Sequence, residues 1–340
     1  MKSTIRSIAE LSGLSPATVD RALHNRAHVS PATRQRVLET ARRVGYLPEA
    51  GATALPVDPA HLEFLIPVGS NEFLGDLARH LQDFAARLPL VASARVHRLA
   101  GLTAGDLLDG LERISPRTSG VGVVATDEPR SRELLRDLCQ GDTRLVTIAS
   151  DIPAVPRSAY VGVDNRAAGR LAGLLMGRLA RASAARFAIF LGTHMYRGHE
   201  ERVTGFRSIL AEAFPAARLV RQIEVFEREP ESYEATLRLL RGSPAIDGIY
   251  CAGGARAGIV RALEESGRAG DILLACHDLT AESRRFLLSG AVDFVIDQNA
   301  RLVAEQAIIA LLGSIASALP ALTRKLVEPR VIFRENIPLV

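Results

Sequence analysis

LSGLSPATVDRALHNR, residues 11–26, contains a turn and a helix start that together decide the fold of the N-terminal region. Ser15 and Pro16 form a helix-start signal, because a serine side chain can cap a backbone amide and proline is tolerated at the first helical position. Upstream, IRSIAELS (residues 5–12) places Ile5, Ile8 and Ala9 on one helical face, and Gly13 supplies a tight turn. Two short helices joined by a glycine turn are typical of the helix-turn-helix motif, whose second helix can enter a DNA major groove.

A third helix is expected to begin at a second Ser-Pro pair, Ser30 and Pro31, and to end at Gly45, with Pro48 preventing its continuation. The three helices are short, so we expect a small domain over residues 1–48 with a minimal apolar core. The core residues predicted from the spacing are Ile8, Val19, Leu23, Val37 and Leu38.

The positive charge of the chain is concentrated in this small domain. Residues 1–48 hold eight of the 42 Lys and Arg residues and three of the 38 Asp and Glu residues, a net charge of +5, which leaves about −1 for the remaining 292 residues. A basic module attached to a nearly neutral body favours binding to a polyanion such as DNA, although small helical domains are often basic without that role.

The composition bounds the remaining classes of function. With 340 residues and 47% hydrophobic residues, the chain can form two or three domains with sizeable cores. We expect no membrane span, because no apolar run is long enough, and no signal peptide, because MKSTIRSIAEL lacks an unbroken apolar core. Cys139, Cys251 and Cys276 are scattered and odd in number, which favours a reducing cytoplasm over a disulfide framework.

The first 48 residues, from TIRSIAELSGLSPATVDRAL to ARRVGYLP, resemble without a gap the DNA-binding head of the LacI/GalR family of bacterial transcription regulators. The resemblance implies that Pro16, Ala17 and Arg21 contact bases, and a guanidinium can bond guanine O6 and N7 together. Other positions would meet the phosphate backbone or the groove. The full set of implied DNA contacts is Thr4, Ser15, Pro16, Ala17, Thr18, Asp20, Arg21, His24, Thr33, Tyr46 and Leu55.

Some of these positions have a second interpretation. Thr18 and Thr33 could simply cap helices. Asp20 replaces the commoner serine, and it either pairs with an Arg of the head or accepts from a cytosine amine. In residues 49–60, the resemblance implies a hinge helix whose Leu55 wedges into the minor groove; Glu49 and Gly51 depart from this pattern, and the alternative is a plain flexible linker.

From residue 61 the pattern changes to short apolar runs that alternate with helical stretches, which predicts parallel sheets built from βαβ units. About 280 residues are too many for one such sheet, so two lobes are expected. The expected strands are HLEFLIPV, SGVGVVAT, TRLVTIAS, SAYVGVD, RFAIFLG, IDGIYCAG, ILLACHD and VDFVIDQ.

This part resembles the ribose-type periplasmic sugar-binding proteins, most clearly in YVGVDNRAAGRLAG and RVTGF. The resemblance implies an α/β, two-lobed periplasmic-binding-protein-like core with Rossmann-like parallel sheets, behind a small all-α head. The expected lobes are residues 61–163 with 299–325 and residues 164–298 with 326–340, joined by passages near Asp164, Gln298 and Leu326. The implied ligand contacts, all in loops after strands, are Asn71, Phe73, Asp151, Tyr196, Arg202, Asp278 and Gln298.

Carboxylate, amide and guanidinium groups can bond pairs of sugar hydroxyls, and an aromatic ring can stack on the apolar face of a sugar. Alternatively, Asp278 and Gln298 could cap helices or join the lobes, and Phe73 could belong to the core. Gly253 stands where sugar binders often carry Asn, so a larger ligand could fit there. His194 and His199 lack the spacing of a metal-binding motif, and we expect neither a metal nor a cofactor.

The sequence therefore predicts a DNA-binding transcriptional regulator, most simply a repressor, that acts as a homodimer on a pseudo-palindromic operator and responds to a sugar or cyclitol. The alternatives are a sugar-responsive activator or a regulator that needs a corepressor. A sugar-transport protein is disfavoured by the basic head. An enzyme is disfavoured because we find no nucleophile elbow, Walker loop or paired catalytic carboxylates.

Overall fold

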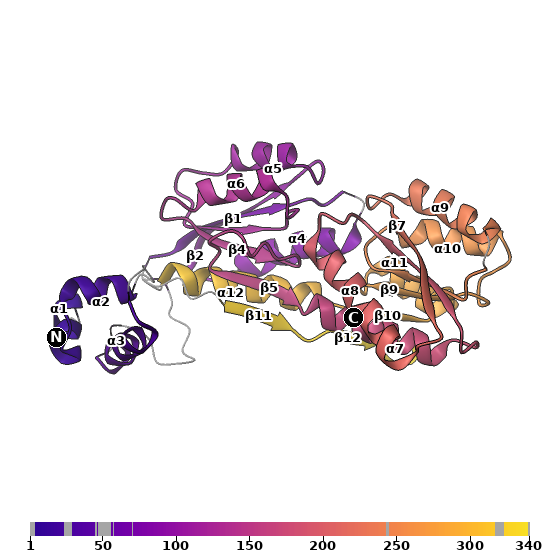
Figure 1. Cartoon of the computed structure of the whole chain (residues 1–340). Helices are drawn as coiled ribbons and strands as arrows, with labels where there is room; N and C mark the ends of the chain where they lie inside the picture. The colour runs from indigo at the N-terminus through magenta and orange to yellow at the C-terminus, as the bar shows by residue number, and fades with distance from the viewer. Residues whose placement is uncertain are drawn as a thin grey trace.

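The computed structural model describes residues 4–23, 29–44, 46, 56, 58–69, 71–242, 245–316 and 323–338. Figure 1 shows a small group of helices at one end, followed by two α/β lobes that lie end to end. None of the helices in the described part of the chain is long and apolar enough to cross a membrane.

The head consists of α1 (Ile5–Ser12), α2 (Pro16–Leu23) and α3 (Pro31–Arg43). Each begins at a hydroxyl cap: Thr4 for α1, Ser15 for α2 and Ser30 for α3, whose side chains accept from backbone amides three residues further along. Gly13 ends α1 in the left-handed conformation with φ 66°, which glycine adopts without a steric penalty. The predicted core forms around Ile8, Val19, Leu23 and Val37, and Leu38 packs against it half-buried.

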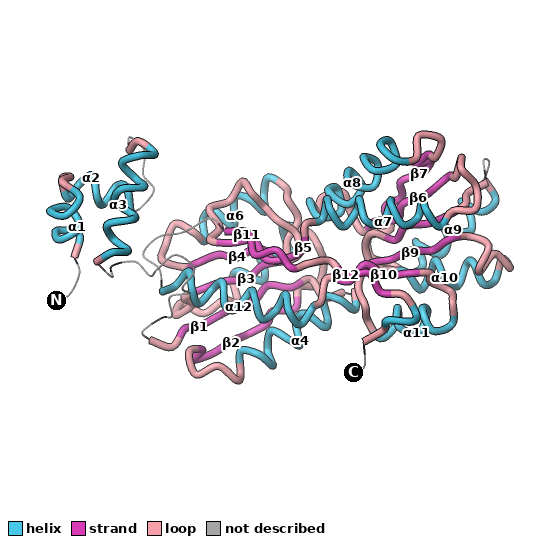
Figure 2. The backbone as a smooth tube through the Cα atoms, turned by 90° about the horizontal axis from the view of Figure 1, so that it is seen from below, coloured by secondary structure: helices cyan, strands magenta, loops and turns pink. Residues whose placement is uncertain are grey.

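The first lobe is a six-stranded parallel sheet in the order β11-β5-β4-β3-β1-β2. Helices α4 and α12 cover one face, which faces the viewer in Figure 2, and α5 and α6 cover the other, as Figure 1 and the apolar clusters show. Its strands are β1 (Ala60–Ile66), β2 (Val91–Arg98), β3 (Gly120–Val123), β4 (Arg144–Ile148), β5 (Ala159–Val163) and β11 (Thr323–Val327). Its helices are α4 (Glu72–Ala85), α5 (Ala104–Leu111), α6 (Pro129–Leu138) and α12 (Ala300–Ala316).

The second lobe is a sheet in the order β12-β10-β9-β8-β6-β7, in which only β12 runs antiparallel to its neighbour. Helices α7 and α8 pack on one face, and α9, α10 and α11 pack on the other. Its strands are β6 (Arg186–Leu191), β7 (Arg218–Glu224), β8 (Gly248–Cys251), β9 (Leu273–His277), β10 (Phe294–Asp297) and β12 (Arg330–Ile332). Its helices are α7 (Asn165–Leu179), α8 (Arg197–Ala213), α9 (Glu229–Arg241), α10 (Arg256–Glu265), α11 (Ala281–Ser289) and the short 3-10 helix η1 (Arg334–Asn336).

All eight strands expected from apolar runs are present, but β2, β7, β11 and β12 were not expected. Each of the four lies at an edge of its sheet, where residues are mostly half-buried or exposed rather than buried. The sequences of β2 and β7, VASARVHR and RLVRQIE, therefore lack the continuous apolar run by which buried parallel strands are recognised.

The chain passes between the lobes three times. It leaves the first sheet after β5, returns after β10, and leaves again between β11 and β12. We expected the last passage near Leu326, which is too early: Leu326 and Val327 still pair with Gly162 and Val163 of the first sheet. The passage therefore falls at residues 328–329, because the ladder with β5 continues to its last residue.

Candidate functional site

A cavity lies between the lobes at the carboxyl ends of the strands, and it contains about 430 Å³ of space that is partly open to solvent. Such a position is typical of ligand sites in parallel α/β folds. Loops from both lobes line it, each directly after a strand or at the start of the following helix. The lining residues are Asn71, Phe73, Leu74, Val124, Ala149, Ser150, Tyr196, Gly198, His199, Arg202, Glu227, Gly253, Asp278 and Gln298.

Six of the seven ligand contacts expected from the sequence line this one cavity, although their sequence positions span more than 220 residues: Asn71, Phe73, Tyr196, Arg202, Asp278 and Gln298. The alternative that Phe73 belongs to the core is also partly true, because its ring is buried within the apolar cluster of the first lobe. Asn71 also caps α4, since its side chain accepts from the amide of Leu74.

Asp151 is the exception, because it does not line the cavity. Its carboxylate accepts from the Thr147 hydroxyl at 2.9 Å and forms an ion pair with Arg157, 2.5 Å between Nε and Oδ1. The carboxylate therefore stabilises the loop after β4 within the first lobe. The neighbouring Ser150 lines the cavity in its place and accepts from the amide of Gly198 across the lobes, at 3.3 Å.

Arg202 is held in position by the close packing of α7 against α8. Gly169 and Gly205 permit this packing, because a Cβ at either would lie about 2 Å from a carbonyl oxygen of the other helix. The buried guanidinium donates through Nε to Asn165 Oδ1 at 2.8 Å and through Nη1 to the carbonyl of Ala252 at 2.6 Å. These two bonds fix the plane of the guanidinium at the wall of the cavity.

Asp278 and Gln298 form a hydrogen-bonded pair on the side of the cavity that the second lobe provides. Gln298 Nε2 donates to Asp278 Oδ1 at 2.8 Å, and the Asp278 backbone is left-handed with φ 68°. Burial raises the pKa of Asp278 to about 6, although the charges of Arg202 and Arg256 lower it. Gln298 Oε1 and the Tyr196 hydroxyl are buried and have no hydrogen-bond partner among the described residues.

Glu227 is the functional candidate that the sequence analysis missed. It follows β7, one of the four unexpected strands, and its carboxylate lines the cavity beside His199, whose Nε2 lies 3.8 Å from Oε1. A signal existed in principle, because every other cavity loop also follows a strand. Recognising β7 would have pointed to residues 225–228.

Hydrogen bonds join the lobes around the cavity. Asn71 Nδ2 donates to Glu227 Oε2 at 3.2 Å, and the amide of Asp127 donates to the carbonyl of Met195 at 2.8 Å. The amide of Glu282 donates to the carboxylate of Glu72 at 3.1 Å. The two lobes are therefore closed on one another at the cavity.

His194 and His199 lie in different surroundings. His199 is buried, and burial together with the nearby charge of Arg202 lowers its pKa to about 3, so the ring is neutral. His194 lies on the surface, where it contacts Glu200 and Gln222. No group of three or more His, Cys, Asp or Glu residues that could hold a metal ion occurs among the residues that the structure describes.

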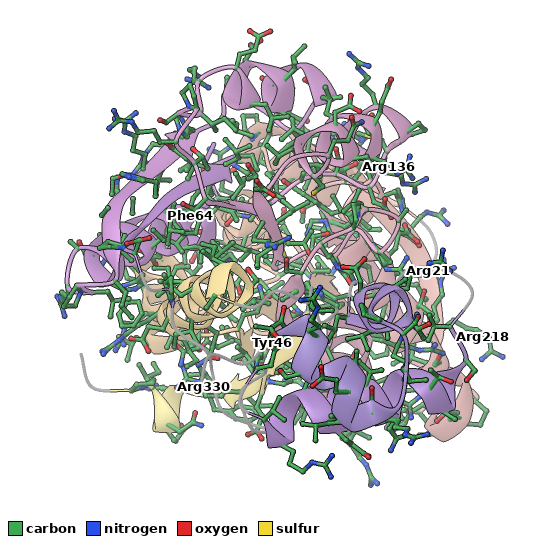
Figure 3. All side chains as sticks on the ribbon, turned by 90° about the vertical axis from the view of Figure 1, so that its left-hand side faces the viewer. Arg21, Tyr46, Phe64, Arg136, Arg218 and Arg330 are labelled. Atoms are coloured by element: carbon green, nitrogen blue, oxygen red, sulfur yellow. The ribbon has the colours of Figure 1, made fainter. Side chains whose placement is uncertain are left out.

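The head presents one exposed face of α2. Val19, Ala22 and Leu23 are buried against the other two helices, whereas four of the expected DNA contacts are exposed: Ser15, Pro16, Ala17 and Arg21. Figure 3 views the head end-on and shows Arg21 and Tyr46 well separated. A nearly continuous exposed surface at the start of α2 is what a recognition helix needs to reach base edges.

The remaining expected DNA contacts differ in their exposure. Thr4 is exposed, and Thr18, Asp20, Thr33 and Tyr46 are half-buried. The hydroxyls of Thr18 and Thr33 contact the cap serines Ser15 and Ser30, at 2.9 and 2.8 Å, but it is the serine side chains that accept from the backbone amides. His24 and Leu55 lie outside the described residues.

Comparison with known proteins decides the family. Residues 4–49 match the family model of bacterial regulatory proteins of the lacI family, and residues 64–315 match that of the periplasmic binding protein domain. The chain belongs to the LacI family of bacterial regulatory proteins. The head and the two-lobed core described above correspond to these two matches.

Individual relatives agree with this assignment. DegA, a helix-turn-helix transcriptional regulator of Bacillus subtilis, is 26% identical over 222 residues, and the match spans 63% of this chain and 62% of DegA. CelR, a regulator of the same type from Thermobifida fusca, is 26% identical over 288 residues, or 78% of each protein. The structure of GanP, a glucose-galactose binding protein of Geobacillus stearothermophilus, superimposes with a TM-score of 0.74 at 21% identity, over 83% of this chain and 100% of GanP.

The departure at Gly253 has a physical explanation in this LacI-family chain. A Cβ at Gly253 would lie 2.7 Å from Glu227 Oε1, which is closer than real Cβ atoms approach. The space that a larger side chain would fill here is therefore occupied in part by the Glu227 carboxylate. We therefore no longer expect Gly253 simply to make room for a larger ligand. The Glu227 carboxylate occupies part of the space of the Asn side chain that sugar binders often carry at this position.

Asp278→Asn should remove a pH dependence of stability from this LacI-family chain. Because the native pKa of about 6 lies above the ordinary 3.8, the folded state binds more protons than the unfolded state between these values. Stability therefore falls as the pH rises from 4 to 6, by about 3 kcal/mol in total. The variant should melt at a higher temperature than the wild type at pH 8 and at the same temperature at pH 4.

The substitution is suited to the site, because Asn also tolerates the left-handed backbone and can still accept from Gln298. Thermal unfolding at the two pH values measures the effect, with the wild type as the control. An equal difference in melting temperature at both pH values would contradict the role of ionisation.

Proposed function

We propose that this LacI-family chain is a DNA-binding transcriptional repressor whose affinity for its operator is controlled by a sugar or cyclitol bound between the lobes. The observation that carries the proposal is the cavity itself. Two buried polar atoms of residues that line it, the Tyr196 hydroxyl and Gln298 Oε1, have no partner among the described residues. Buried polar atoms are normally bonded, so a ligand with hydroxyl groups would complete them.

The other lining residues suit the same ligand chemistry. Arg202 and the amide of Asn71 can donate to hydroxyl oxygens, and Asp278 can accept from hydroxyl protons. The ring of Phe73 offers an apolar surface to C–H groups. A compact polyol presents all three kinds of surface, which is why we favour a monosaccharide, sugar acid or cyclitol as the class.

Coupling between ligand and head would run through the closure of the lobes. Asn165 accepts from Arg202 and donates to the carbonyl of Ala149 in the first lobe at 3.2 Å. A ligand that contacts Arg202 therefore acts on a residue that joins both lobes. The ligand can change DNA affinity only through its different affinity for the two arrangements of the lobes, and typical couplings are about 5- to 150-fold.

We further propose that the protein acts in the cytoplasm as a homodimer on a pseudo-palindromic operator. One small head contacts few base pairs, and two heads related by a two-fold axis match two half-sites. The basic charge of residues 1–48 supports phosphate contacts on each half-site. We assign the cavity no catalytic step, because the geometry provides binding groups rather than an activated nucleophile.

Thermal-shift screening of the full chain with a panel of monosaccharides, sugar acids and cyclitols tests the proposal. A compound that binds should raise the melting temperature and change the affinity for a selected operator roughly 5- to 150-fold. Nonspecific DNA of the same length serves as the control, because its binding depends on phosphate contacts alone. Failure of every compound that binds to alter operator affinity would contradict the regulatory role.

A further inference from the structure

Glu227 occupies a position built to hold a carboxylate. Phe226 and Glu227 adopt left-handed backbone conformations in succession, with φ 50° and 58°, which is costly for residues other than glycine. Three glycines surround the carboxylate: a Cβ at Gly192, Gly253 or Gly254 would lie 1.9, 2.7 or 2.2 Å from one of its oxygens. A strained loop and a glycine cradle around one side chain indicate a role beyond packing.

The contacts of Glu227 orient its carboxylate at the cavity wall. Oε2 accepts from the amide of Gly254 at 2.5 Å and from Asn71 Nδ2 of the other lobe at 3.2 Å. Burial raises the pKa of Glu227, whereas the Gly254 amide and the charges of Arg256 and Arg202 lower it. The side chain thus both forms part of the cavity and joins the two lobes beside it.

The charge balance of the cavity follows from this placement. Among the described residues that line it, Arg202 is the only cation, because His199 is neutral. Its guanidinium faces two carboxyl groups, Glu227 and Asp278, and already donates to Asn165 and Ala252. A ligand carrying a carboxylate or phosphate would bring a further negative charge into a buried site that already holds two acidic groups. Like charges placed together in such a site repel strongly.

We propose that Glu227 is a specificity-determining residue that admits uncharged polyols and excludes anionic ones such as sugar acids and sugar phosphates. The inference rests on the proposed function and narrows its ligand class, since sugar acids are removed from the candidates. Hydroxyl groups of an uncharged sugar or cyclitol can donate to the carboxylate, whereas an anionic group cannot. The same carboxylate accepts a hydrogen bond from Asn71 of the other lobe. An anionic ligand that is repelled by Glu227 would therefore also oppose the closed arrangement of the lobes.

The test compares matched pairs of probes by calorimetric titration of the full chain. The pairs are glucose with glucuronate, galactose with galacturonate, and myo-inositol with myo-inositol monophosphate. We expect the uncharged member of the pair that binds to bind at least ~10-fold more tightly to the wild type. Glu227→Gln should reduce this ratio at least ~10-fold, and Glu227→Asp should retain most of it because the charge is kept.

Glu72→Gln is the matched control. Glu72 also accepts a hydrogen bond across the lobes, from the amide of Glu282, but does not line the cavity, so its ratio should equal that of the wild type. Equal binding of acids and uncharged sugars by the wild type, or an unchanged ratio in Glu227→Gln, overturns the specificity role of Glu227. Neither outcome contradicts the proposed function. If no probe of either charge binds, the proposed function fails as well.

Discussion

Arg202→Ala should abolish the response of operator binding to a sugar or cyclitol ligand. The buried guanidinium lines the cavity, and its removal leaves no cation among the described lining residues to balance Glu227 and Asp278. Charged hydrogen bonds to a buried ligand contribute about 1.5 to 3 kcal/mol each, so we expect ligand affinity to fall roughly 100-fold. Thermal shift with a ligand that stabilises the wild type, followed by operator titration, measures both effects.

The same substitution should also destabilise the core. Asn165 Oδ1 and the carbonyl of Ala252 lose their donor, and an acceptor left buried without a partner costs about 1 to 3 kcal/mol. The pKa values of Asp278 and Glu227 should rise further, because the charge of Arg202 lowers both. Operator binding without ligand should remain, since the head folds around its own core.

Arg207→Ala is the control for this prediction. Arg207 lies on the same helix, α8, but is exposed and bonds Gln222 on the surface. It should leave both ligand binding and the operator response unchanged. A full response to a confirmed ligand in Arg202→Ala would contradict the assignment of the cavity and would leave Arg202 with a purely structural role.

Arg21→Ala should weaken binding to the operator by about 1 to 3 kcal/mol and relax the preference for one base in each half-site. Arg21 is exposed on α2 while Val19, Ala22 and Leu23 of the same helix are buried, so the guanidinium is free to reach a guanine edge without disturbing the core. Titration against the operator and against variants substituted at each position measures the affinity and the preference.

Arg6→Ala provides the comparison within the head. Arg6 is exposed on α1, and its substitution removes the same charge as that of Arg21. Helix α1, however, does not enter the groove in this motif. The substitution should weaken operator and nonspecific DNA alike and reduce the dependence on salt. An Arg21→Ala variant that keeps full base preference would show that α2 is not the recognition helix.

The sequence alone determined the head and the class of the core. The serine caps, the turn at Gly13 and the apolar spacing within each short helix act over a few residues, so their signals are local. The buried strands were equally clear, because parallel strands covered on both faces are almost continuously apolar. Six of the seven residues expected at the cavity line it, and they were found through resemblance to a known fold rather than through any local pattern.

The tertiary structure alone decided which polar residues are available at the cavity and which are not. Asp151 and Ser150 are neighbours, yet only the folded loop shows that Arg157 neutralises the one while the other bonds Gly198 across the lobes. Glu227 depends on an edge strand without a clear pattern, on a left-handed backbone, and on glycines far from it in sequence. Apart from the ion pair of Asp151 with Arg157, these are contacts between segments separated by tens to more than a hundred residues. Propensity and periodicity describe only what a segment does by itself, so they could not reveal such contacts.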